Sequence, residues 1–507
     1  MSESNKSSSS YHSPNRGTGR GQAIIIGAGI GGIATSIRLA AKGFKVNVLE
    51  ANAYAGGKLS ETILNGYRFD AGPSLFTLPE LVDELFSLAG KNASDYFQYE
   101  RLDEICRYFY EDGTRITAHS DLQKFAEEIA LKTGIQASKV TKHLEQSKEM
   151  YELTDKLFLQ SSLHKLDSYL QPHAIKALFN LGKLKTSQVM HQANQRQFGD
   201  NRITQLFDRY ATYNGSDPYK APATLNIIPH LEYNLGAYFP KGGMYSITTS
   251  LVKLAEEMGV QFHFNQKVTE IVVEDKKVKG VKTNSLFYPA EMVVSNVDIS
   301  TTYKHFLPKQ KHPTKLLNQE KSSSGIVFYW GMKTPFPELG LHNIFFTKDY
   351  KEEFEFIFNK KQAYHDPTVY LNVSSKHEPN DAPSGCENWF TMINVPNNQG
   401  QDWDSIISEA RENILQKLSR LLGKDIQQNI ECEAILDPRS IESRTGSALG
   451  ALYGNSSNNQ FAAFLRHANF SSNIRNLYFC GGSVHPGGGI PLCLFSAKIV
   501  SDLISRK

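Results

Sequence analysis

The sequence predicts an α/β protein whose core is a Rossmann-like nucleotide-binding domain, assembled from three separated stretches of chain. Two observations predict this fold class. A buried strand, a glycine-rich turn, a helix and a second strand follow one another over residues 23–50, which is a βαβ unit. A second strand–glycine–helix pattern closes the chain from Leu477 onward. The 507 residues suffice for about three structural units and exclude an isolated small module.

Composition excludes several classes of protein. Apolar residues make up 40% and Lys+Arg 55 nearly balance Asp+Glu 52, which excludes a mainly disordered chain. A net charge of +3 is too weak to indicate a nucleic-acid partner. The five cysteines are scattered with no Cys-x-x-Cys pair, so we expect no disulfide framework, no metal site and a reducing, cytoplasmic location.

The N-terminal region contains a polar tail followed by the most apolar stretch of the chain. Residues 1–20 are rich in Ser, Asn, Gly and Arg and predict a disordered tail. Residues 23–41 contain four glycines and Arg38, and they fall short of the roughly 20 apolar residues of a membrane span. We therefore expect neither a transmembrane helix nor a secretion signal.

The elements are expected in the following order. The first βαβ unit comprises a strand at Ala23–Ile26, a helix at Ile30–Ala41 closed by Gly43, and a strand at Lys45–Glu50. Residues 81–201 favour mostly helical segments. The next expected elements are a helix at Ile247–Met258 and strands at Gln261–Phe264, Val268–Val273, Lys279–Thr283 and Met292–Ser295. Residues 301–430 are α+β in character, with a strand at Ile326–Trp330, and Leu477–Cys480 is the last strand.

The turn of the first unit, residues 27–32, matches the pattern G-x-G-x-x-G. Gly27 permits the tight turn, Gly29 lets the backbone approach a pyrophosphate, and Gly32 lets the helix pack on the sheet. Glu50 ends the second strand, where its carboxylate can accept hydrogen bonds from ribose hydroxyls. Together these features predict dinucleotide binding rather than an ordinary βα turn.

A second glycine pair favours FAD over a nicotinamide cofactor. Gly56, Gly57 and Lys58 follow the second strand. The glycines let the backbone approach a phosphate or ribityl chain, and the lysine can balance its charge. A surface turn with a solvated lysine is the alternative. A nicotinamide dehydrogenase needs no such second element.

Several motifs resemble a known family. Residues 27–32, 50, 56–58 and 69–73 resemble the FAD-binding start of the flavin amine oxidase and phytoene desaturase superfamily. Residues 211–218, 239–244 and 477–491 are similar to the bacterial-type phytoene desaturase family of carotenoid enzymes. Residues 67–79 and 106–113 look most like its 1-hydroxycarotenoid 3,4-desaturase branch, because phytoene desaturases usually carry Thr where this chain has Ser74. Lys58 stands where many members have Arg, and Val484 where Thr or Ala is usual.

The resemblance implies a division into domains and a set of cofactor contacts. The FAD-binding domain would comprise residues 21–80, 236–300 and 431–507, and the substrate-binding region residues 81–235 and 301–430. The ADP and pyrophosphate would contact Gly27, Gly29, Gly32, Glu50, Gly56, Gly57 and Lys58, and the adenine the backbone of Val268. The ribityl chain and flavin would lie along Gly482, Ser483, Gly488, Gly489 and Ile490. No side chain is identified as a catalyst.

The implied reaction is the introduction of a C=C bond into an acyclic or monocyclic carotenoid. A hydride would pass to flavin N5 from a carbon allylic to the polyene, and the adjacent carbon would lose a proton. The favoured reaction is 1-hydroxycarotenoid 3,4-desaturation, with phytoene desaturation, isomerisation and ketolation as alternatives in the same family. A flavin amine oxidase and a non-catalytic carotenoid-binding protein are alternatives from other classes.

A basic amphipathic stretch predicts contact with a membrane surface. Between residues 161 and 196, five cations (Lys165, Lys176, Lys183, Lys185, Arg196) interleave with leucines and other apolar residues against a single acid, Asp167. Helices packed on the domain with solvated lysines are the alternative. Since carotenoids reside in membranes, we expect a peripheral helical insert at about residues 120–230.

Overall fold

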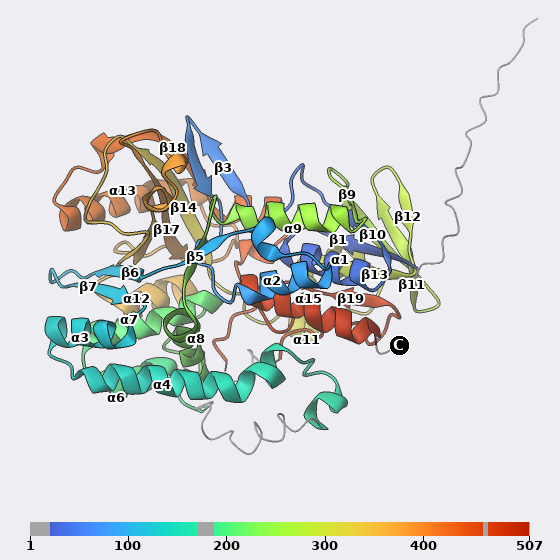
Figure 1. Ribbon diagram of the computed structural model, residues 1–507, viewed down its shortest axis with the longest axis horizontal. Helices are drawn as coiled ribbons and strands as arrows, with labels where there is room; N and C mark the ends of the chain where they lie inside the picture. Colours follow the sequence, from blue (N-terminus) through green and yellow to red (C-terminus); the bar gives the residue numbers. More distant parts are fainter. Residues whose placement is uncertain (1–20, 171–186, 460–464, 506–507) are drawn as a thin grey trace, which may run out of the picture.

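The computed structural model describes residues 21–170, 187–459 and 465–505. A parallel sheet with its helices lies on the right of Figure 1, and a larger mixed sheet lies on the left. The predicted tail at 1–20 and the cations Lys176, Lys183 and Lys185 of the basic stretch lie outside the described residues.

The parallel sheet has five strands in the order β19-β13-β1-β2-β9, and all neighbours run parallel. Its strands are β1 (Gln22–Ile26), β2 (Lys45–Leu49), β9 (Gln261–His263), β13 (Met292–Ser295) and β19 (Leu477–Phe479). Each was expected from the sequence, and the structure confirms them. They come from stretches 21–80, 236–300 and 431–507, so residues more than 400 positions apart lie in one sheet.

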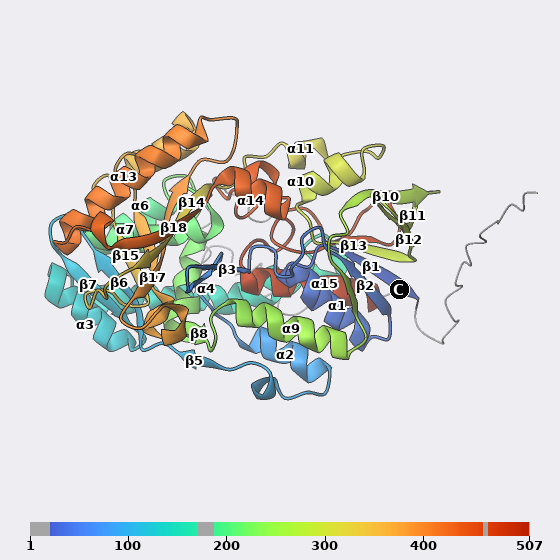
Figure 2. The same cartoon turned by 90° about the horizontal axis from the view of Figure 1, so that it is seen from above.

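Both faces of the parallel sheet are covered, which explains its uninterrupted apolar strands. Ala23 and Ile25 face a helical layer, whereas Ile24 and Ile26 face the opposite side. The helical layer consists of α1 (Ile30–Ala41), α2 (Glu80–Leu88), α9 (Tyr245–Glu257) and α15 (Ile490–Ser505). The other face packs on an antiparallel sheet of β10 (Val268–Glu274), β11 (Lys277–Thr283) and β12 (Phe287–Pro289) (Figure 2).

The mixed sheet has seven strands in the order β18-β14-β17-β16-β15-β6-β7. These are β6 (Glu104–Phe109), β7 (Arg115–His119), β14 (Ser324–Met332), β15 (His342–Phe345), β16 (Val369–Asn372), β17 (Glu387–Val395) and β18 (Ile430–Leu436). Phe328 and Trp330 of β14 pack under α13 (Trp403–Leu422), and Val327 and Tyr329 face β4 (Tyr67–Asp70). Strand β18 belongs to this sheet although it lies at the start of the third stretch.

The expectation of mostly helical structure over residues 81–201 is wrong for residues 99–119. Strands β6 and β7 form a hairpin there, closed by a turn in which the Tyr110 N–H donates to the Thr114 carbonyl and Gly113 has φ +82°. Asp112-Gly113 between two runs of β-forming residues is the local signal for this hairpin. The helices follow it, as α3 (Leu122–Thr133), α4 (Ala137–Thr154), α6 (Met190–Phe198) and α7 (Asn201–Asp208).

The remaining regular elements are short. The strands are β3 (Glu61–Leu64), β5 (Tyr99–Arg101) and β8 (Tyr238–Pro240), and the helices are α8 (Ile228–His230), α10 (Ile299–Thr301), α11 (Thr314–Leu317), α12 (Tyr350–Glu355) and α14 (Pro438–Thr445). None of the helices in the described ranges is both long enough and apolar enough to cross a bilayer.

Candidate functional site

The first glycine turn lies where β1 meets α1. Gly27 adopts φ +93°, and its N–H donates to the Leu49 carbonyl over 2.8 Å. Gly29 is the N-cap of α1 and forms no side-chain cap, so the first turn of the helix presents backbone N–H groups. A Cβ on Gly32 would lie 2.2 Å from the Gly27 carbonyl oxygen. The turn therefore has the shape and the donors of an anion site at a helix N-terminus.

Asn296 occupies the space behind this turn, and the sequence analysis missed it. Its side chain lies 2.7 Å from the positions that a Cβ would take on Gly29, Gly31 or Gly481. Asn296 directly follows β13, so it lies at the carboxyl edge of the parallel sheet with the ends of β1, β2 and β19. The position after a predicted parallel strand was the available signal, because ligands bind at that edge.

The carboxylate of Glu50, at the end of β2, is held by donors from the first glycine turn and from Asn52. Its Oε2 accepts from the Ala28 N–H, and its Oε1 accepts from the backbone and side-chain amides of Asn52, each over 2.8 Å. A carboxylate has about four acceptor sites, so Oε2 can still accept from a hydroxyl. The Glu50 carbonyl accepts from the Gln266 N–H, which brings the buried Val268 to the same edge.

The second glycine pair contacts the first turn. A Cβ on Gly57 would lie 3.5 Å from the Gly29 Cα, and the Gly56 N–H donates to the Ala28 carbonyl over 2.7 Å. Lys58 is not a solvated surface lysine: its Nζ donates to the carbonyls of Leu452 (2.7 Å) and Ala451 (3.2 Å). Burial lowers the pKa of Lys58 to about 8, against the opposing effect of the Asp298 carboxylate.

The closing motif forms a compact loop between β19 and α15. A Cβ on Gly482 would lie 3.2 Å from the Gly488 Cα, and a Cβ on Gly488 would meet the Tyr453 ring at 2.8 Å. The Ser483 Oγ accepts from the Ile299 N–H over 2.9 Å. Gly489, which has no atom within 4 Å of its Cβ position, precedes Ile490 at the start of α15.

His485 holds this loop against residue 161. Its Nε2 donates to the Ser161 carbonyl over 2.9 Å, and burial lowers the pKa of His485 to about 4. The ring is therefore neutral at physiological pH. This arrangement agrees with a histidine that fixes the loop rather than one that transfers protons.

One cavity of about 1110 Å³ connects these parts. Twelve of the thirteen predicted site residues line it; Gly32 packs behind the turn instead. The cavity continues beyond the glycine loops between the helical insert and the mixed sheet, where its wall includes Phe158, Leu231, Val327 and Phe390. The arrangement suits a dinucleotide at the sheet edge with a long apolar ligand beside it.

A buried charged cluster lies in the wall of this extension, and the sequence analysis missed it. Arg209 Nη2 contacts Glu232 Oε2 at 3.1 Å, with Arg209 5% and Glu232 2% exposed. Tyr210 donates to the same oxygen over 2.6 Å, and Tyr213 donates to Glu232 Oε1. The only local signal for this cluster was an arginine, Arg209, beside Phe207 and Tyr210. Its carboxylate partner, Glu232, lies 23 residues further along the chain.

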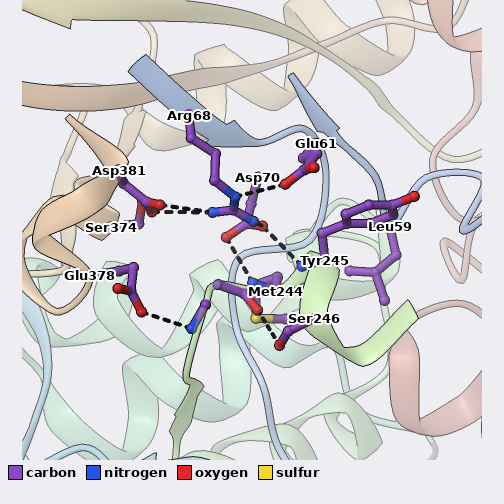
Figure 3. A network of polar contacts seen from close by, with 12 residues as sticks. Leu59, Glu61, Arg68, Asp70, Met244, Tyr245, Ser246, Ser374, Glu378 and Asp381 are labelled. Atoms are coloured by element: carbon purple, nitrogen blue, oxygen red, sulfur yellow. Dashed lines mark hydrogen bonds and ion pairs between the residues drawn. The ribbon is translucent and has the colours of Figure 1, made fainter. Parts of the chain in front are cut away.

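Two of the family-like motifs meet in a polar network (Figure 3). Asp70 accepts from the N–H groups of Met244 (2.9 Å) and Tyr245 (3.0 Å) at the start of α9. Arg68 bridges Glu61, Asp70 and Asp381, with N–O distances of 2.7, 2.7 and 3.2 Å. The network therefore ties the β3–β4 hairpin to α9 and to the loop after β16.

Comparison with known proteins gives a consistent picture. The pattern that defines the family "Flavin containing amine oxidoreductase" matches residues 30–505. The chain is 50% identical over 483 residues to a 1-hydroxycarotenoid 3,4-desaturase from a Flavobacterium species, covering 95% of this chain and 99% of that one. It is 33% identical to a 4,4'-diapolycopene oxygenase from Methylomonas, with 95% and 97% covered. The fold is similar to a crystal structure of an oxidoreductase from Methanosarcina mazei, with a TM-score of 0.63 at 15% identity, covering 96% and 100% of the two chains.

Proposed function

The chain belongs to the flavin-containing amine oxidoreductase family, and from this premise we propose that it is a 1-hydroxycarotenoid 3,4-desaturase. It is a FAD-dependent oxidoreductase of the carotenoid desaturase type. The observation that carries the finer assignment is the 50% identity, over nearly the full length of both chains, with a desaturase of that name. A long apolar cavity beside the cofactor motifs supports it.

The glycine turns fit FAD, because their backbones line the cavity and carry no side chain that would keep a phosphate or ribityl group away. The α1 N-terminus would hold the pyrophosphate and Glu50 a ribose hydroxyl. The proposed contacts are Gly27, Gly29, Gly32, Glu50, Gly56, Gly57, Lys58 and Val268 for the ADP half, and Gly482, Ser483, Gly488, Gly489 and Ile490 for the ribityl chain and flavin.

Bound FAD supplies the two-electron acceptor that a desaturation requires. The protein orients the substrate and keeps water away from it. Apolar walls from the helical insert and the mixed sheet would hold the polyene extended and exclude water from the reacting end. The positive charge that develops on the substrate is spread over the conjugated chain, so no strongly basic side chain is needed.

We propose the domain division that follows from this assignment, with residues 21–80, 236–300 and 431–507 binding FAD and residues 81–235 and 301–430 binding substrate, except that β18 joins the mixed sheet of the substrate-binding region. We also propose that the protein takes its substrate from a membrane surface. Phe158, Leu159 and Leu163 line the cavity immediately before the basic stretch that begins at Lys165, which supports an entrance on that side.

Product analysis tests the proposed reaction. Purified protein is incubated with liposomes that hold 1-hydroxylated γ-carotene, lycopene or phytoene in separate reactions. We expect a product two hydrogens lighter, with red-shifted absorption, from the hydroxylated carotenoid. Conversion of phytoene would show an early desaturase, and a product of unchanged mass with an altered retention time would show an isomerase.

Flotation of the same liposomes tests the proposed membrane contact. Protein left entirely in the dense fraction would reject that contact.

The lowered pKa of Lys58 predicts a pH dependence of FAD binding. A bound pyrophosphate would raise the pKa of Lys58 above its value of about 8 in the free protein, so binding takes up a proton above that pH. The Kd for FAD should stay constant below pH 8 and rise above it, by up to about tenfold per pH unit. Titration of FAD into apoprotein measures this. In Lys58→Arg the Kd for FAD should depend less on pH, and in Lys58→Met it should be higher at every pH. A pH dependence of Kd in Lys58→Met equal to that of the wild type would reject Lys58 as a contact of the pyrophosphate.

A further inference from the structure

Three polar side chains form a hydrogen-bonded chain in the cavity wall. Ser74 Oγ lies 2.6 Å from the Tyr370 hydroxyl, which lies 2.7 Å from His342 Nδ1. His342 and Tyr370 come from the paired strands β15 and β16, and all three residues line the cavity. His342 is 4% exposed, and its Nε2 has no hydrogen-bond partner in the described part of the chain.

The surroundings of His342 decide which ring nitrogen carries its proton. The Asn372 side-chain nitrogen donates to the Leu341 carbonyl over 3.0 Å and lies 3.2 Å from His342 Nδ1. An amide nitrogen only donates, so Nδ1 accepts and the proton resides on Nε2. Burial, together with the nearby Arg209 guanidinium, lowers the pKa of His342 to about 3, so the ring stays neutral. The cavity wall thus carries a buried N–H donor for which the described residues supply no acceptor, and such a donor is costly unless a ligand supplies one.

The Ser74 end of this hydrogen-bonded chain lies close to the turn that contains Lys58. A Cβ on Gly72 would lie 1.8 Å from the Lys58 carbonyl oxygen, so residue 72 packs directly on that turn. Ser74 is two residues further on, within about 8 Å along the chain. In a 1-hydroxylated end group, four bonds separate the hydroxyl oxygen from C4, so these two atoms lie about 5 Å apart when the end group is extended. A group that binds this hydroxyl must therefore lie near the reacting carbon.

We propose that His342, positioned by Tyr370 and Ser74, recognises the terminal hydroxyl of the substrate by donating its Nε2–H to the hydroxyl oxygen. The inference rests on the proposed function for the identity of the substrate. A carotenoid without the hydroxyl would leave the N–H unpaired, so the site would discriminate against it.

The test compares binding and turnover of 1-hydroxylated γ-carotene with those of γ-carotene. Binding to the FAD-loaded protein is followed by the change in carotenoid absorption. The wild-type protein should favour the hydroxylated compound by roughly 10- to 100-fold in Kd. His342→Phe keeps a planar ring without an N–H donor and should bring this ratio close to one. His342→Gln, which retains a donor, should recover part of it.

Two further variants make the result specific. His143→Phe is the matched control, since His143 is a buried histidine in tilted ring contact with Phe198 and Phe207 outside the cavity wall, and it should keep the wild-type ratio. Tyr370→Phe removes only the supporting hydroxyl and should lower the ratio even if His342→Phe fails to fold. A wild-type ratio in both His342→Phe and Tyr370→Phe, or no preference in the wild type, would overturn the inference. Preferential binding that depends on His342 but yields no lighter product would overturn the proposed reaction and leave the binding site standing.

Discussion

Gly29→Val is expected to yield a folded protein that contains no FAD. The valine Cβ would meet the Asn296 side-chain amide at 2.7 Å, so the N-cap of α1, where the backbone must approach the pyrophosphate, would have to shift. Two or more charge-assisted hydrogen bonds from the turn to the pyrophosphate would be lost, which should raise the Kd for FAD at least about a hundredfold. Flavin absorbance relative to protein in the purified sample measures the effect.

The control for this variant lies on the same helix. Ala41→Val adds a branched side chain at the exposed end of α1 and should keep FAD stoichiometric. The fold of Gly29→Val should survive because the nearest obstacle is the Asn296 side-chain amide rather than backbone. Stoichiometric FAD in Gly29→Val would contradict the pyrophosphate assignment, whereas loss of the far-ultraviolet circular dichroism signal would show that the glycine is needed for folding instead.

Arg68→Met is expected to cause the largest loss of stability. The guanidinium neutralises the buried carboxylates of Asp70 and Asp381, which are 5% and 1% exposed, and also contacts Glu61 (Figure 3). Burial raises the pKa of both aspartates, and the nearby arginine opposes that shift. Without the arginine, buried charge is left uncompensated at a cost of about 3–5 kcal/mol. Urea unfolding measures the change in free energy.

An exposed ion pair supplies the comparison. Lys148→Met removes a contact with Glu152, in which the two side chains are 55% and 61% exposed, and should change the free energy of unfolding by no more than about 1 kcal/mol. Adding Asp381→Asn to Arg68→Met should recover part of the loss, because one of the unpaired charges is then gone. Equal effects of Arg68→Met and Lys148→Met would show that the network in Figure 3 does not stabilise the fold through its charges.

The sequence by itself determined the parts of this protein that are encoded locally. The strand–turn–helix at residues 22–41, the carboxylate of Glu50 and the closing strand and helix were all predicted, and they lie where expected. Each depends on residues within about 25 positions of one another, whose glycines and apolar periodicity specify the backbone directly. The β6–β7 hairpin was missed although its turn signal is local, because the surrounding helical pattern outweighed it.

Tertiary structure alone decided which distant side chains meet. Asn296 fills the space behind a glycine turn 267 residues earlier, Glu232 pairs with Arg209 across a buried wall, and Ser74 reaches His342 through Tyr370. Periodicity reports which face of an element is buried but not which partner covers it. Hydrogen-bond partners across the cavity are set by strand order and helix packing, so they follow from the folded chain and from no shorter segment of it.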